Sequence, residues 1–325
     1  MAVFIDFLWL VLGLVLLYFG AEWLVHGARE LSLRLGIGPL VVGLTVVAFG
    51  TSPPELLVSL QANLQDPPKG DMALGNVVGS NICNIALILG AGALIRPIGV
   101  HLQILRKDLP VLLLISLAFV GLLQNGVITR WEGALLFGGV ILYTVISLVQ
   151  ARREPDRIAL EAGAEDTVEA AGKKNAGRLL LNLFLVVAGI TGLVYGADRL
   201  VYGGSGIARE FGISEATIAL TIVAFGTSLP ELATSVVAAL KKQGDLIIGN
   251  AIGSCIFNIL CVVGLTASVA PLARSPDLQN ADLLVMLGLT VIILPFLWSR
   301  KNLSRVEGGI LLGIYAGYVA WLGLR

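Results

Sequence analysis

The sequence has few charged residues. Asp, Glu, Lys and Arg together make up 14% of its 325 residues, whereas a soluble domain carries about 25%. Hydrophobic residues make up 56%, which is more apolar material than one core of this size can bury. We therefore expect lipid to be the solvent for most of the chain.

Histidine and cysteine are also scarce. The two histidines, His26 and His101, lie away from the repeated motif described below, and the three cysteines lie in apolar segments without metal-ligand spacing. Transition metals prefer His or Cys ligands, and a nucleophilic enzyme needs a base near its nucleophile. Neither pattern is present, so we expect no enzymatic activity, no cofactor and no nucleic-acid partner.

Apolar runs long enough to span a bilayer, about 20 residues each, occur ten times. The predicted spans are 3–25, 39–62, 71–94, 108–124, 131–150, 179–201, 214–240, 245–270, 281–299 and 304–323. A charged linker, 151–178, separates a first half, 1–150, from a second half, 179–325.

The distribution of Lys and Arg predicts the orientation. The loops after odd-numbered spans contain 16 of these residues, and the opposite side contains 6. Because Lys and Arg accumulate in cytoplasmic loops, we expect the linker in the cytoplasm and both termini outside, in the cell (plasma or inner) membrane.

One motif occurs twice. The run TVVAFGTSPPEL at 45–56 returns as TIVAFGTSLPEL at 221–232, and GNVVGSNICN at 75–84 returns as GNAIGSCIFN at 249–258. The motif thus covers 45–84 in the first half and 221–258 in the second. Since each half has an odd number of spans, the halves must insert in opposite senses. The predicted fold is an all-α membrane protein of ten transmembrane helices in two inverted five-helix repeats, with a substrate site near the midplane.

Two acidic residues, Glu55 and Glu231, lie at equivalent positions inside apolar spans. An acidic group at the bilayer centre costs about 2.5–3.5 kcal/mol, and neither span contains Lys or Arg. A bound cation or a proton is therefore the expected compensation. Pro54 and Pro230 precede the two glutamates and should interrupt the helices there.

Other oxygen-bearing side chains accompany the glutamates. Thr51 is four residues before Glu55, which would place both on one helix face if the kink at the proline leaves that geometry intact. The same spacing relates Ser80 to Asn84, and Ser254 to Asn258. An all-oxygen set with two carboxylates suits Ca²⁺, which takes about 6–8 oxygen ligands, and Na⁺ could use the same oxygens.

The paired motifs resemble the α-repeats of the cation/Ca²⁺ antiporter superfamily, and most closely those of prokaryotic Na⁺/Ca²⁺ exchangers. The resemblance covers the ten-span chain and implies Na⁺/Ca²⁺ exchange by alternating access, with Ca²⁺ between the two glutamates and Na⁺ beside it. It implies that spans 1 and 6 slide across the core. The implied ligands are Glu55, Thr51, Ser52, Ser80, Asn84 and the Ala48 carbonyl, with Glu231, Thr227, Ser228, Ser254, Asn258 and the Ala224 carbonyl.

Two alternative functions remain open from the sequence. Cation/H⁺ exchangers of the same superfamily also pair two glutamates, so a Ca²⁺/H⁺ antiporter is the main alternative. A cation channel is more remote, because a two-fold repeat with interrupted helices suits alternating access better than a continuous pore. Asn84 and Asn258 stand where K⁺-dependent relatives carry Asp, which argues against K⁺ co-transport.

Overall fold

A computed structural model of the chain describes residues 2–151, 176–212, 224–274 and 280–324. The described part is all-α apart from four two-residue strands. Two predicted features fall partly outside it: residues 152–175 of the linker and 214–223 of the seventh span.

The helices include short π-helical and 3-10 turns, written η. In chain order they are α1 (Ala2–Leu35), α2 (Pro39–Val42), η1 (Gly43–Val47), α3 (Ala48–Thr51), α4 (Pro53–Asn63), α5 (Gly70–Ile82), η2 (Cys83–Ile88), α6 (Leu89–Ile95), η3 (Ile104–Asp108), α7 (Leu109–Leu122), η4 (Leu123–Asn125), α8 (Arg130–Ala151), α11 (Ala176–Glu210), α13 (Ala224–Gly226), α14 (Leu229–Leu240), α15 (Gly244–Phe257), η6 (Asn258–Val263), α16 (Gly264–Val269), α17 (Asn280–Arg300) and α18 (Arg305–Gly323).

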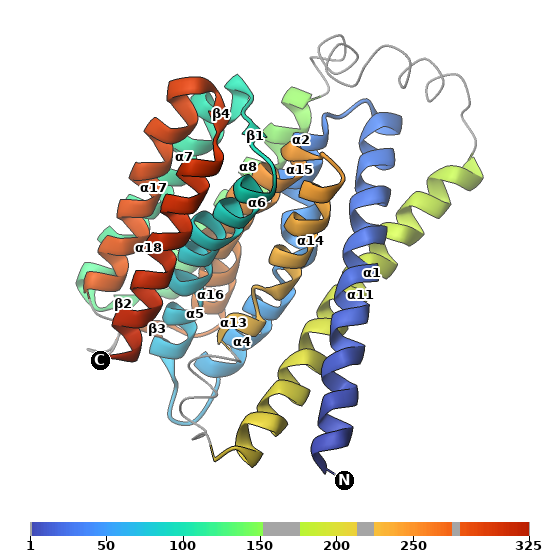
Figure 1. Ribbon diagram of the computed structural model, residues 1–325. Helices are drawn as coiled ribbons and strands as arrows, with labels where there is room; N and C mark the ends of the chain where they lie inside the picture. Colours follow the sequence, from blue (N-terminus) through green and yellow to red (C-terminus); the bar gives the residue numbers. More distant parts are fainter. Residues whose placement is uncertain (1, 152–175, 213–223, 275–279, 325) are drawn as a thin grey trace.

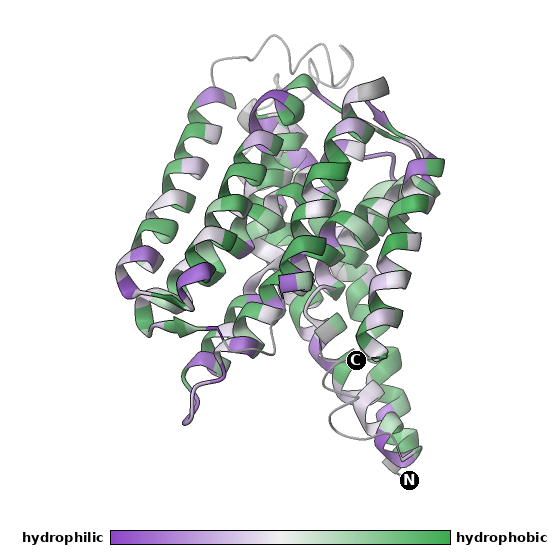
Figure 2. Cartoon of the chain, turned by 90° about the vertical axis from the view of Figure 1, so that its left-hand side faces the viewer, coloured by the Kyte–Doolittle hydropathy of each residue, from purple (hydrophilic) through white to green (hydrophobic). Residues whose placement is uncertain are grey.

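Eight helices of the described residues are long and apolar enough to cross a membrane, and a bent pair, Pro39–Thr51 with Pro53–Asn63, makes up to nine. Apolar residues colour most of their length in Figure 2. These nine correspond to nine of the ten predicted spans. The helix Leu229–Leu240 covers the described part of the remaining predicted span, 214–240.

The helices that carry the repeated motif form the centre of the bundle. In the span Gly244–Val269, every residue of the most apolar window is buried, whereas in Arg305–Gly323 only 11% are. A helix that is apolar on all sides and surrounded by other helices is typical of a core position. The backbones approach closely there, because a Cβ atom on Gly253 would lie 2.8 Å from the Leu44 carbonyl oxygen.

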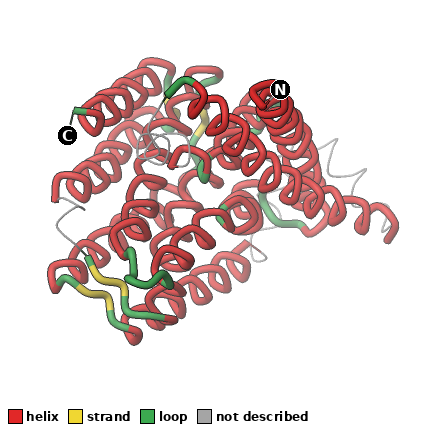
Figure 3. Tube along the Cα trace, turned by 90° about the horizontal axis from the view of Figure 1, so that it is seen from below, coloured by secondary structure: helices red, strands yellow, loops and turns green. Residues whose placement is uncertain are grey.

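The two longest helices, α1 and α11, pack along each other at one edge of the molecule, opposite α17 and α18 (Figures 1 and 3). They contain 34 and 35 residues, which at 1.5 Å per residue is about 50 Å. This exceeds the hydrocarbon thickness of about 30 Å, so these helices must tilt or extend beyond the bilayer. Near the end of α14, Lys241 joins the pair to the bundle through a 2.5 Å ion pair with Glu22 of α1.

The short strands connect the two halves of the chain at both ends of the bundle. Strand β1 (Ile98–Gly99) pairs with β4 (Asn302–Leu303), and β2 (Val127–Ile128) pairs with β3 (Leu272–Ala273), both antiparallel. In each case a strand of the first half pairs with one of the second half. The loop after the third span is therefore hydrogen-bonded to the loop after the ninth, and the loop after the fourth span to the loop after the eighth.

A buried Asp–Tyr pair also occurs once in each half. Tyr143 on α8 donates its hydroxyl to Asp108 before α7, and Tyr318 on α18 donates to Asp282 on α17, each at 3.0 Å. A buried acidic group needs a hydrogen-bond partner. The two bonds therefore fix the same pair of neighbouring helices in each half, outside the repeated motif.

Candidate functional site

Each copy of the repeated motif contains a break in its helix. In the first copy Ser52 lies between α3 and α4, with φ −87° and ψ 5°, and the helix bends there by 44°. In the second copy Ser228 precedes α14 with φ −88° and ψ 4°. The two breaks thus have the same backbone geometry. Glu55 and Glu231 each lie in the first turn of the helix that follows, where the helix dipole favours a negative charge.

The two carboxylates are buried next to each other. Glu55 and Glu231 are each 1% exposed, and they are close enough to repel each other electrostatically. Within the described ranges, no Lys or Arg forms an ion pair with either one. Two like charges held together without a basic partner require a cation or protons for compensation.

Hydroxyl groups of the first copy face the carboxylate of the second. The Ser52 hydroxyl lies 3.4 Å from Glu231 Oε1, and Thr51 also reaches this carboxylate. The placement of Thr51 and Glu55 on one helix face required that the break leave the helix geometry intact, and this condition is not met, because the helix is interrupted at Ser52 between them.

The reciprocal arrangement surrounds Glu55. Ser228 of the second copy and Ser80 of the first both reach its carboxylate, and their own hydroxyl oxygens lie 3.4 Å apart. Each glutamate is therefore contacted by the serine at the helix break of the other copy.

Among the residues that the structure describes, five buried oxygen atoms of this region have no hydrogen-bond partner. They are Glu55 Oε2, Glu231 Oε2, Asn84 Oδ1, Asn258 Oδ1 and Ser254 Oγ. All five belong to residues selected from the sequence. An unpaired buried polar atom costs about 1–3 kcal/mol, so five of them in one region indicate a place for a ligand that accepts oxygen lone pairs.

The two asparagines lie at irregular turns of their helices. Asn84 is the second residue of the π-helical turn η2, and Asn258 is the first of η6. Single π-helical turns inside α-helices are frequent at functional sites. Because η2 packs against α14 and η6 packs against α4, each asparagine lies on the segment that faces the glutamate-bearing helix of the other copy.

Sequence reasoning missed Asn76, which holds the glutamate backbone in place. Its side-chain amide donates to the Glu55 carbonyl oxygen at 3.0 Å, and its Oδ1 accepts from the Thr227 hydroxyl at 3.3 Å. The predicted residue Thr227 thus binds a neighbouring side chain at the site.

Asn250 has the same role in the second copy. Its amide donates to the Glu231 carbonyl oxygen at 3.4 Å, and its Oδ1 accepts from the Thr51 hydroxyl at 3.3 Å. The sequence did contain a signal for this residue and for Asn76, because the pair Gly-Asn opens the second part of the motif in both copies.

Asn81 is a further contact that the sequence did not indicate, and it breaks the symmetry. Its Oδ1 accepts a hydrogen bond from Asn258 Nδ2 at 3.1 Å, which orients the unpaired Asn258 Oδ1. The equivalent position in the second copy is Cys255, so a thiol takes the place of the amide beside Asn84.

The two alanines occupy equivalent places. Ala48 begins α3 and Ala224 begins α13. The Ala48 carbonyl oxygen accepts from the Ser52 hydroxyl at 2.9 Å and from the Ser52 backbone N–H at 3.2 Å. The ligand role of both carbonyls stays a prediction.

Comparison with known proteins gives consistent results. A family model described as sodium/calcium exchanger protein matches residues 5–149 and 181–324. The chain is 39% identical over 316 residues to a putative antiporter, CaxA, of Alkalimonas amylolytica, covering 96% of each protein. It is 30% identical over 346 residues to the sodium/calcium exchanger MaX1 of Methanosarcina acetivorans, covering 98% of each.

The fold is also similar to that of a solved exchanger. The structure of the sodium-calcium exchanger NCX_Mj, soaked with Na⁺ and Sr²⁺, matches with a TM-score of 0.84 at 30% sequence identity. The match covers 98% of each chain.

Proposed function

Because the chain belongs to the sodium/calcium exchanger family, we propose that it is a secondary active antiporter that exchanges Na⁺ for Ca²⁺. The observation that carries the proposal is the group of five unpaired buried oxygens, which includes one carboxylate oxygen from each half. A divalent cation between the two carboxylates would balance their charge and supply the missing partner.

The proposed Ca²⁺ ligands are the oxygens without partners. They are the carboxylates of Glu55 and Glu231, the amide oxygens of Asn84 and Asn258, and the Ser254 hydroxyl. Ca²⁺ accepts flexible all-oxygen coordination, whereas Mg²⁺ requires a tight octahedron and retains its waters. The remaining predicted oxygens, from Thr51, Ser52, Ser80, Thr227, Ser228 and the Ala48 and Ala224 carbonyls, are the proposed Na⁺ ligands beside the central ion.

The proposed transport cycle alternates access to this site. We assign ten spans in two inverted repeats, with the termini outside and the linker in the cytoplasm. The pairing of Ser52 with Glu231 and of Ser228 with Glu55 supports a two-fold relation between the copies. The edge pair α1 and α11 is the proposed moving unit, since it packs mainly along itself.

Ion gradients imposed on liposomes test the counter-ion. Purified chain is reconstituted, the vesicles are loaded with Na⁺, and uptake of radioactive calcium is followed after dilution into Na⁺-free buffer. We expect uptake only with the Na⁺ gradient, whether or not K⁺ is present. Uptake that follows a pH gradient and ignores Na⁺ would identify the protein as a Ca²⁺/H⁺ antiporter and refute the proposal.

Empty liposomes and liposomes containing Glu55→Gln provide the controls. Neither should accumulate calcium above leakage. Single-channel currents in planar bilayers that do not depend on a Na⁺ gradient would instead identify a cation channel.

A further inference from the structure

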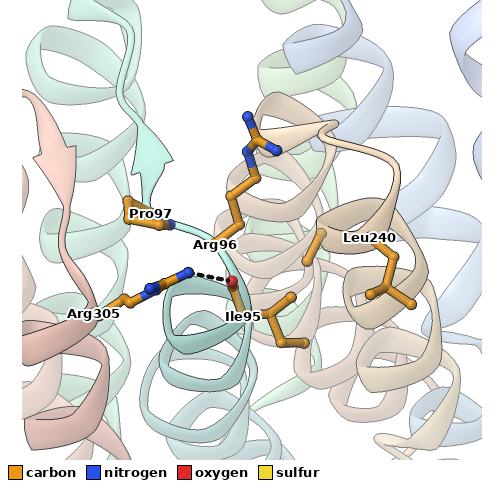
Figure 4. Close-up of a pocket in the computed structure, with 6 residues that line it drawn as sticks. Ile95, Arg96, Pro97, Leu240 and Arg305 are labelled. Carbon is orange, nitrogen blue, oxygen red and sulfur yellow. Dashed lines mark hydrogen bonds between the residues drawn. The ribbon is translucent and has the colours of Figure 1, made fainter.

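A surface pocket at one end of the bundle lies outside the cation site. It has a volume of about 520 Å³ and is lined by Ile95, Arg96, Pro97, Ala239, Leu240 and Arg305. Figure 4 shows Pro97 and Arg305 on one side and Leu240 on the other, with Arg96 and Ile95 between them. The pocket is formed where α6 and α14 end and α18 begins.

Both arginines of the pocket lack an acidic partner. Among the described residues, no carboxylate pairs with Arg96 or Arg305. Arg305 Nη2 donates to the Ile95 carbonyl oxygen at 3.3 Å, which holds this guanidinium at the pocket (Figure 4). The nearby Glu307 bonds instead to Ser304 at the start of α18. Two guanidinium groups without a carboxylate partner give this pocket the positive charge that suits a phosphate.

Part of the pocket wall is apolar and exposed at the surface of the bundle. Leu240 is 64% exposed and Ile95 is 37% exposed, and the adjacent Leu94 and Val306 are also exposed. Because three spans end or begin here, the pocket lies at the depth of the lipid headgroups, with the apolar side chains toward the acyl region. A ligand for this site should combine a negative headgroup with an apolar tail.

We propose that this pocket binds an anionic phospholipid, with the phosphate on Arg96 and Arg305 and the upper acyl chains against Ile95 and Leu240. Basic pockets between membrane helices on the cytoplasmic side are suited to such headgroups. Lys242, two residues after the end of α14, adds a further positive charge at this end of the bundle.

Native mass spectrometry of the detergent-purified full chain tests the proposal without measuring transport. The protein is titrated with phosphatidylglycerol and, separately, with phosphatidylcholine. We expect retention of phosphatidylglycerol in preference to phosphatidylcholine. The variant Arg96→Gln/Arg305→Gln should bind phosphatidylglycerol about thirty-fold more weakly, since each basic residue near the surface contributes about a five-fold factor.

The matched control is Arg106→Gln/Lys301→Gln, which removes the same charge at positions that do not line the pocket. It should bind the lipid like the wild type. Equal losses in both variants would attribute binding to net charge and overturn the proposal. So would equal retention of the two lipids, or a wild-type chain that binds neither.

Glycerol phosphate distinguishes a lipid site from a plain anion site. At the concentration at which phosphatidylglycerol saturates the protein, we expect glycerol phosphate not to displace it, because it lacks the acyl chains that contact Ile95 and Leu240. Complete displacement by glycerol phosphate would contradict the proposed role of the apolar walls.

Discussion

Asn84 and Asn258 each offer a buried amide oxygen without a hydrogen-bond partner, and each should supply one neutral ligand to the bound cation. Replacing either with Ala removes one oxygen from a set of about 6–8. We expect a loss of Ca²⁺ affinity of about ten-fold, the effect of removing one strong polar contact. Titration calorimetry of the purified variants measures it.

The control for these variants is Ser116→Ala, which removes a buried unpaired hydroxyl from α7. Its Ca²⁺ affinity should equal that of the wild type. If both asparagine variants bind Ca²⁺ with wild-type affinity, these amides are not ligands of the site.

Asn81 should act through Asn258. Because Asn81 Oδ1 accepts from Asn258 Nδ2, Asn81→Ala frees the amide to rotate and should weaken Ca²⁺ binding about three- to five-fold, the effect of one neutral hydrogen bond. The loss should disappear in an Asn258→Ala background and persist in an Asn84→Ala background. Additive losses in both backgrounds would show that Asn81 does not position Asn258.

The sequence selected the side chains that are proposed here to carry the site, because a second copy of the motif identified polar residues that packing alone does not require. It did not predict how they pair. The contact of Ser52 with Glu231 depends on the packing of segments 179 residues apart. The roles of Asn76 and Asn250 were also inaccessible, since a mid-span Asn does not reveal which carbonyl it will bind.

At the scale of helices, the proline that follows each copy of the Gly-Thr-Ser run correctly predicted an interruption, although its place, Ser52 or Ser228, came from the structure. The π-helical turns at Asn84 and Asn258 had no sequence signal. They depend on how each helix packs against its neighbours, which local residue preferences do not encode.

The contact between α1 and α11 depends on glycine. A Cβ atom on Gly189 would lie 2.6 Å from the Leu24 backbone nitrogen and 2.8 Å from the Gly20 carbonyl oxygen. Gly189→Ala must therefore separate the two helices, at a cost of about 1–3 kcal/mol. We expect a lower thermal unfolding midpoint and a several-fold slower exchange rate in liposomes.

Gly138→Ala is the matched control on α8, where the added Cβ meets no described atom within 4 Å. Alanine is the better helix former by about 1 kcal/mol, so this variant should be as stable and as active as the wild type. Equal behaviour of the two variants would show that close α1–α11 packing is not needed.

At the scale of the whole molecule, hydrophobicity correctly predicted an all-α membrane protein, because the bilayer imposes a single length and polarity on each span. Span edges were less well defined: α1 continues to Leu35 and α11 to Glu210, well past the apolar runs 3–25 and 179–201. Because the last turns of both helices are more polar than the runs before them, hydropathy does not mark where these helices stop.

The central claim is that Glu55 and Glu231 jointly hold one Ca²⁺, and calcium titration of Glu55→Gln and Glu231→Gln tests it most directly. Each variant should remain folded, with an unfolding midpoint no lower than that of the ion-free wild type, because removing a buried charge lowers its desolvation cost. The wild type should bind one Ca²⁺ at this site, and each variant should bind at least about 100-fold more weakly, as expected when one partner of a buried ionic contact is lost. Near wild-type affinity in either variant would contradict the account.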